Sequence, residues 1–274
     1  MKRFFALFAA LTLLCTGISA QTAACRTETG IAYRDAAGDG YVDSLCRLDI
    51  CWPADRKGFP TVVWFHGGGL TGGRREIPKA LCGKGFAVVG VDYRLAPRVK
   101  VSDCVADAAA AAAWVVKNIA SYGGDPRLIF IAGHSAGGYL TSMIGLDKRW
   151  MAPYGIDPDT AFAALIPYSG QVVTHFARRR EMGVPDTQVV VDDMAPLNHV
   201  RPDCPPVLIL SGDRELEMLG RYEENAYFWR MMRVAGHPDV RICEFDGFDH
   251  GNMPQAGHYV AVRYIRDRVK KLER

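Results

Sequence analysis

The sequence Leu128-Ile-Phe-Ile-Ala-Gly-His-Ser-Ala-Gly-Gly138 decides the fold. Its first five residues, Leu128–Ala132, predict a buried strand, and Tyr139–Leu146 predicts a helix. Between them Gly133-His134-Ser135-Ala136-Gly137 matches G-x-S-x-G, which holds a serine on a strained turn between a strand and a helix. The turn is too tight for bulky neighbours, which explains the flanking glycines. We therefore expect Ser135 to be an exposed nucleophile at the end of a strand.

Other strand-like runs flank this stretch, and most of them are apolar throughout. They are Thr61–Phe65, Phe86–Val91, Ala163–Pro167, Val207–Leu210 and Val240–Phe245. Such runs suit strands buried on both faces of a parallel sheet. The more polar Ile31–Arg34 and Leu45–Trp52 predict an antiparallel edge. The expected fold class is α/β, a doubly wound and mostly parallel sheet with helices on both faces.

Helical patterns separate these strands. Ser102–Ser121 is alanine-rich with Ser102 as its expected cap, Arg221–Ala235 is amphipathic, and Gln255–Arg274 accumulates basic residues toward its end. One interval breaks the alternation, because residues 169–206 (Ser169–Pro206) contain little that resembles a strand apart from Val189–Val191. Insertions of this length are commonly binding loops or lids, so we expect a small lid.

A second glycine-rich motif, His66-Gly67-Gly68-Gly69, follows the predicted strand Thr61–Phe65. Glycines expose backbone N–H groups that no Cβ shields, and such groups stabilise the oxyanion of a tetrahedral intermediate. Two motifs of this kind, each at the end of a strand and in this order, predict one catalytic site. The site needs no metal and no cofactor.

A serine hydroxyl becomes a strong nucleophile when a histidine accepts its proton and a carboxylate orients that histidine. The strand Val207–Leu210 runs into Ser211-Gly212-Asp213, so Asp213 is the expected acid. The strand Val240–Phe245 is followed by His250, the expected base. The alternatives are Glu215 or Glu217 for the acid and His258 for the base, whereas Asp249 is expected to be a loop carboxylate.

These motifs, together with Val91-Asp-Tyr-Arg-Leu-Ala-Pro97, resemble the esterase/lipase branch of the α/β-hydrolase superfamily, which includes hormone-sensitive-lipase-like esterases and bacterial carbohydrate esterases. The resemblance implies a carboxylesterase with an oxyanion hole made by the N–H groups of Gly68, Gly69 and Ala136. Two features depart from the hormone-sensitive-lipase-like pattern. His134 stands where an acidic residue is usual, and residues 21–31 leave no room for a large N-terminal cap. The likeness therefore shifts toward compact, secreted acetyl- or feruloyl-type esterases and toward arylformamidases.

Residues 1–20 have the pattern of a signal peptide, with Lys2-Arg3, an apolar stretch and small residues up to Ala20. Residues 21–274 would then form one α/β-hydrolase domain, exported to the periplasm or beyond, with lipidation at Cys25 as an alternative. Losing Lys2 and Arg3 leaves 31 basic against 30 acidic residues. A net charge this close to zero gives no field that would attract nucleic acid or an anionic membrane. We therefore predict neither nucleic-acid binding nor stable membrane insertion. Seven cysteines would remain, and some are expected to pair in an oxidising compartment.

The predicted function is hydrolysis of short-chain, acetyl-type esters of polar alcohols, with carbohydrate esters as the substrate class, through an acyl-enzyme. The charged interval 169–206 offers little apolar surface for lipid, which favours a water-soluble substrate. Two alternatives stay open. One is an amidase or formamidase with the same three residues, and the other is a catalytically silent binding module.

Overall fold

The computed structural model describes residues 25–274, so the predicted signal peptide at residues 1–20 lies outside the described part. This part contains an eight-stranded sheet in the order β1-β2-β4-β3-β5-β6-β7-β8. Its strands are β1 (Cys25–Ala32), β2 (Arg47–Pro53), β3 (Phe59–Phe65), β4 (Ala87–Val91), β5 (Gly124–His134), β6 (Ala164–Tyr168), β7 (Val207–Gly212) and β8 (Val240–Phe245). From β4 to β8 all neighbours are parallel, whereas β2 is antiparallel to both β1 and β4. The prediction of a mostly parallel α/β sheet with an antiparallel edge is confirmed.

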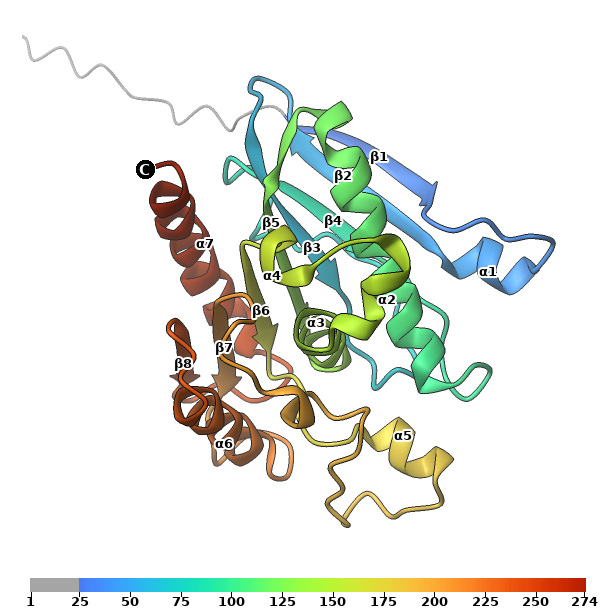
Figure 1. Ribbon diagram of the computed structural model, residues 1–274, viewed down its shortest axis with the longest axis vertical. Coiled ribbons are helices and arrows are strands. Elements are labelled where there is room, and N and C mark those ends of the chain that lie inside the picture. Colours follow the sequence, from blue (N-terminus) through green and yellow to red (C-terminus); the bar gives the residue numbers. More distant parts are fainter. Residues whose placement is uncertain (1–24) are drawn as a thin grey trace, which may run out of the picture.

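Helices connect these strands (Figure 1). The α-helices are α1 (Gly40–Leu45), α2 (Val101–Asn118), α3 (Ala136–Leu146), α4 (Pro158–Ala161), α5 (Phe176–Glu181), α6 (Arg221–Val234) and α7 (Met253–Leu272). Short 3-10 turns are η1 (Ile119–Tyr122), η2 (Lys148–Trp150), η3 (Ala152–Tyr154) and η4 (Pro196–His199). Most predicted elements appear within a few residues of their expected ends.

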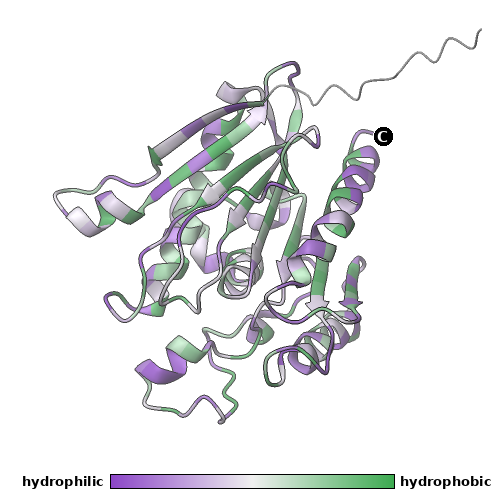
Figure 2. Cartoon of the chain, turned by 180° about the vertical axis from the view of Figure 1, so that it is seen from behind, coloured by the Kyte–Doolittle hydropathy of each residue, from purple (hydrophilic) through white to green (hydrophobic). Residues whose placement is uncertain are grey.

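The core has two halves, one on each face of the sheet. Along β3, Val63 and Phe65 join the half that contains residues of α2, α3 and α6, whereas Val62 and Trp64 join the half beneath α7. This alternation follows from the two-residue period of a strand. It explains why the predicted strands are apolar throughout, and Figure 2 shows the central strands mainly in green.

The two faces are covered unequally. Parallel neighbours are usually joined by a helix, but the β3–β4 connection at residues 66–86 consists of turns and irregular chain. On the face of the sheet that packs against α7, this helix is the main helical cover among the described elements. Cavities remain between α7 and the irregular connection.

The interval 169–206 contains α5 and η4 and lies toward the carboxyl end of the sheet (Figure 1). Arg179 is 3% exposed, and it donates to the carbonyls of Thr174, Asp186 and Gln188 at 2.7–2.9 Å. Arg179, one of the charged residues of this interval, is therefore buried and stabilises the fold of the segment. That the segment acts as a lid stays a prediction.

A residue of the same interval contacts the start of α2, where the predicted cap is wrong. Ser102 was the expected cap, but the helix already begins at Val101, after Lys100. The N–H of Val101 instead donates to the carboxylate of Glu181 in α5 at 2.7 Å. This contact, distant in sequence, adds to a local one, in which the Asp103 carboxylate accepts from the N–H of Lys100 at 3.0 Å.

Within residues 25–274 no disulfide joins Cys46, Cys51, Cys82, Cys104, Cys204 and Cys243, although pairing of some cysteines was expected. Burial raises the pKa of several of these thiols, to about 12 for Cys104 and Cys204. They are thus protonated and poorly reactive as the structure stands.

Candidate active site

Ser135 lies on the turn between β5 and α3, with φ of 57°. The flanking glycines are required by close approach of the backbone. A Cβ on Gly137 would come within 2.0 Å of the Phe65 carbonyl oxygen, and one on Gly133 within 2.6 Å of the Gly137 backbone. The strained backbone of Ser135 is therefore held by packing against β3, as the motif predicted.

His250 contacts Ser135 directly. Its Nε2 lies 2.9 Å from Ser135 Oγ, and its Nδ1 lies 2.8 Å from Oε2 of Glu217. With the proton on Nδ1, the imidazole donates to the carboxylate and accepts from the serine hydroxyl. This tautomer makes the histidine a base toward Ser135.

The carboxylate on His250 belongs to Glu217, so the prediction that Asp213 would hold this position is wrong. Asp213 does follow β7, but its carboxylate accepts from the N–H groups of Glu215 at 2.9 Å and Gly247 at 2.8 Å. It thereby joins the loop after β7 to the loop after β8. One helical turn starts at Asp213, since the N–H of Glu217 donates to the Asp213 carbonyl at 2.8 Å. That turn brings the longer glutamate side chain back to the histidine.

The surroundings of Glu217 favour its charged form. Its side chain is fully buried, and Oε1 accepts from Gly212 N at 3.0 Å and from the Ser169 hydroxyl. Burial by itself would raise the pKa of Glu217, but the hydrogen bonds from His250, Ser169 and Gly212 lower it to about 2. Glu217 is therefore ionised at neutral pH and can stabilise an imidazolium.

No feature of the sequence separates Glu217 from the other two acids of this loop, which occur at every second position. A partial signal is Gly212, because a Cβ there would lie 2.5 Å from the Phe248 carbonyl and 3.0 Å from Glu217 Oε1. Gly212 therefore indicates that the end of β7 is crowded, but it does not identify which acid contacts His250.

Other histidines and acids have structural contacts. His134 Nε2 lies 2.8 Å from the His250 carbonyl and supports that loop, and burial lowers the pKa of His134 to about 4. His258 lies 3.3 Å from the Tyr168 hydroxyl, and burial lowers its pKa to about 4. Asp249 accepts from Gly251 N and Asn252 N, both at 2.9 Å, which fits the expected loop role.

The glycine loop after β3 lies against the serine. A Cβ on Gly67 would be 3.4 Å from Ser135 Cβ, while Gly68 and Gly69 have φ of 113° and 64°. Among the described residues, no hydrogen bond uses the N–H of Gly68 or Gly69. Ala136 is the first residue of α3, where an N–H has no partner inside the helix. The placement agrees with an oxyanion hole at Gly68, Gly69 and Ala136, which stays a prediction.

Residues 25–274 have two further properties, which concern metal ligands and membrane spans. No group of His, Cys, Asp and Glu side chains there could hold a metal ion. No helix there is both long and apolar enough to cross a membrane.

Comparison with known proteins identifies the family. The family model described as BD-FAE matches residues 48–164. A probable carboxylic ester hydrolase, LipM of Mycobacterium tuberculosis, is 32% identical over 241 residues, which are 76% of this chain and 55% of the relative. The chain spans a little over half the length of the first curated relatives it matches.

Solved structures are similar over most of the chain. Thermogutta terrifontis esterase 2, phosphonylated by cyclosarin, has a TM-score of 0.70 at 26% identity and covers 88% of this chain and 94% of its own. A truncated carbohydrate esterase from gut microbiota has a TM-score of 0.72 at 19% identity, over 91% and 98% of the two chains, and shows the fold alone. The chain belongs to the esterase/lipase branch of the α/β-hydrolases.

Proposed function

We propose that the protein is a serine carboxylesterase that hydrolyses short-chain esters of polar alcohols, carbohydrate esters in particular. One observation carries the proposal: Ser135 Oγ, the His250 ring and the Glu217 carboxylate form an unbroken chain of hydrogen bonds. The curated relatives LipC and LipQ of Mycobacterium tuberculosis are esterases, which supports the reaction type.

The proposed reaction uses these groups in turn. His250 Nε2 accepts the hydroxyl proton as Ser135 Oγ attacks the ester carbonyl, and the N–H groups of Gly68, Gly69 and Ala136 bind the resulting oxyanion. His250 then gives the proton to the departing alcohol oxygen, which leaves an acyl group on Ser135. Water attacks this acyl-enzyme by the same route and releases the acid. Glu217 stays ionised and stabilises the imidazolium in both halves.

The alternatives are less well supported. A silent binding module would not need a serine, a base and a buried carboxylate at hydrogen-bond distance from one another. An amidase could use the same groups, but the named relatives are esterases. Phosphonylation of the related Thermogutta esterase by cyclosarin is consistent with an activated nucleophile in this branch.

A cavity of about 570 Å³ beside the catalytic residues supports the proposal that the alcohol part of the ester is polar. It is bordered by His134 and Gly251, the sequence neighbours of Ser135 and His250. Its polar lining includes Glu76, Lys79 and Gln255, and its wall includes Tyr259, which is 79% exposed. Donors, acceptors and an exposed ring suit a hydroxyl-rich leaving group, which must approach His250 to receive its proton.

A substrate series tests the proposal. Since the interval 169–206 exposes few large apolar side chains, namely Met182, Val189 and Val191, we expect poor binding of long acyl chains. The kcat/KM for p-nitrophenyl acetate should exceed that for octanoate by at least about tenfold, or roughly 1.4 kcal/mol of transition-state binding. A preference for octanoate would overturn the short-chain proposal. Faster turnover of a formanilide than of any ester would indicate a formamidase.

Export is also part of the proposal and is tested separately. Cleavage after Ala20 would leave Gln21 as the first residue, and N-terminal sequencing of the protein secreted by a bacterial host would show this directly. A lipid-modified Cys25 at the N-terminus would instead support the lipoprotein alternative.

A further inference from the structure

Three adjoining cavities follow the exposed side of α7. The first is the 570 Å³ cavity beside the catalytic residues, and it shares Ala80, His258 and Tyr259 with a second cavity of about 490 Å³. The second shares Asp267 and Lys270 with a third cavity of about 360 Å³. We call this series of cavities, which share lining residues, the α7 track. At 1.5 Å per residue, the 20-residue helix makes it about 30 Å long, which suits a polymer better than a monosaccharide.

The track becomes basic with distance from the catalytic site. Gln255 and Tyr259 line its first part, and the cations Arg263, Arg266, Lys270 and Arg274 then follow at intervals of three or four residues. This spacing places them along one side of a helix, about one per turn. The nearly even charge of the whole chain thus conceals a local concentration of cations.

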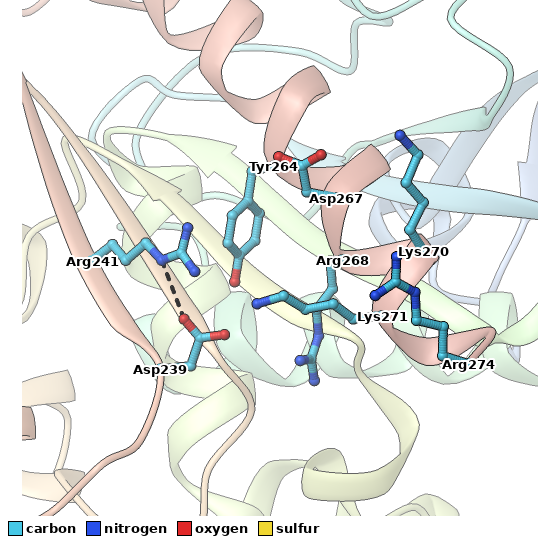
Figure 3. Close-up of a pocket in the computed structure, with 8 residues that line it drawn as sticks. All are labelled: Asp239, Arg241, Tyr264, Asp267, Arg268, Lys270, Lys271 and Arg274. Carbon is cyan, nitrogen blue, oxygen red and sulfur yellow. Dashed lines mark ion pairs between the residues drawn. The ribbon is translucent and has the colours of Figure 1, made fainter.

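Few of these cations are neutralised by carboxylates. Within residues 25–274 Lys270, Lys271 and Arg274 have no ion pair, and Arg263 reaches Asp267 only at 4.0 Å between exposed groups. Exposed ion pairs of this kind contribute little to stability. At the far end Arg241 pairs with Asp239 at 3.3 Å. Five cations and two carboxylates therefore line the third cavity (Figure 3).

A buried hydroxyl in the third cavity has no partner. Tyr264 is 7% exposed, and its hydroxyl makes no hydrogen bond among the described residues. Figure 3 shows the ring among Asp239, Arg241, Arg268 and Lys271. Burial raises the pKa of Tyr264, so its hydroxyl stays protonated and keeps a donor that no described residue uses. Unpaired cations and an unpaired donor together suit an oxyanion.

We propose that the α7 track binds an acidic polysaccharide, with one carboxylate-bearing sugar near each basic turn of α7, and that this chain carries the ester to Ser135. The inference rests on the proposed esterase function for its substrate class. A polysaccharide is favoured over a nucleic acid or an anionic membrane because the track starts beside the catalytic residues. A polymer lying in it brings its own ester groups to the serine.

A binding experiment tests the track without catalysis. The probe is polygalacturonate without ester groups, titrated into the wild-type protein at low salt. The double variant Arg266→Glu/Lys270→Glu should raise Kd at least about tenfold, and the wild-type affinity should fall between about 50 and 200 mM salt. The matched control is Arg56→Glu/Lys57→Glu, which reverses two cations of a separate cavity beside Trp52 and should leave Kd unchanged. Equal affinity in the track variant would overturn the proposal.

A second variant tests the track with a change too small to disturb the fold. Tyr264→Phe removes the unpaired hydroxyl without changing charge, so the fold should be retained as judged by circular dichroism. We expect Kd for polygalacturonate to rise about threefold, in line with one lost hydrogen bond. An unchanged Kd would exclude the hydroxyl from the site. Equally tight binding of neutral xylan, duplex DNA or phosphatidylglycerol vesicles would overturn the choice of ligand.

A kinetic experiment links the track to catalysis. The measured quantity is the ratio of kcat/KM for acetylated polygalacturonate to kcat/KM for p-nitrophenyl acetate. The Arg266→Glu/Lys270→Glu variant should lower this ratio about tenfold, mainly through KM. An unchanged ratio would overturn delivery of the ester by the track. Absence of all ester hydrolysis in the wild-type protein would instead overturn the esterase proposal, while the binding experiment would still decide the track.

Discussion

The turn that holds Ser135 and the loop that holds Glu217 contribute to one site, but they are specified differently. The serine sits on a turn formed by its own neighbours, since β5, two glycines and α3 all lie within residues 124–146, and Phe65 of β3 packs against that turn. The acid is positioned by contacts with Ser169 and His250, which are 48 and 33 residues away. The first kind of position can be recognised in a short motif, and the second depends on which loops meet.

The largest expected effect comes from the locally specified residue. Ser135→Ala removes the nucleophile, and kcat for p-nitrophenyl acetate should fall by about 10⁶-fold with no change in the circular dichroism spectrum. Ser121→Ala, which removes an exposed hydroxyl from η1, is the matched control and should behave as wild type. Retention of more than about a tenth of the activity in Ser135→Ala would contradict the assignment.

The acid gives the next largest effect. Glu217→Gln keeps the size of the side chain but removes the charge that stabilises the His250 imidazolium, so kcat should fall by about 10⁴-fold. Steady-state kinetics at pH 7 would measure this. Glu215→Gln in the same loop should stay near wild type, and a fully active Glu217→Gln would return the role to Asp213.

The same residue should make stability depend on pH. The folded-state pKa of Glu217 is lowered to about 2 from an ordinary 4.5, so its stabilisation is fully present above pH 4.5 and is lost as the pH falls toward 2. The shift corresponds to about 3 kcal/mol of unfolding free energy. Denaturant unfolding at pH 5 and pH 3 should show a larger loss for wild type than for Glu217→Gln. Parallel losses in the two proteins would contradict this origin.

The smallest effect is expected at Asp213. Asp213→Asn weakens one hydrogen bond within the loop after β7 and one that joins it to the loop after β8, without touching His250. The value of kcat/KM should stay within about threefold of wild type, with a small decrease in Tm. A loss comparable to that of Glu217→Gln would show that the two acids cannot be separated as the structure separates them.

Much of the fold could be predicted because its signals are periodic or local. The strands β3 to β7 each contain a continuous apolar run, and such runs are distinctive when both faces of a sheet are buried. The contact between Glu181 and the N–H of Val101 at the start of α2 could not be predicted, because Glu181 lies in the interval between β6 and β7. A helix start is predictable only while its cap is a neighbour in sequence.

The sequence by itself determined the nucleophile, the base and the glycine loop, since each follows a recognisable strand at a short and constrained distance. Only the tertiary structure decided that Glu217, rather than Asp213, meets His250, because three acids on one turn differ in where their side chains end and not in their local pattern. It also placed the cations of α7 along cavities that share lining residues, the first of which is lined by His134 and Gly251. The physical reason is the same in both cases: backbone turns are set by adjacent residues, whereas contacts between side chains depend on how distant segments pack.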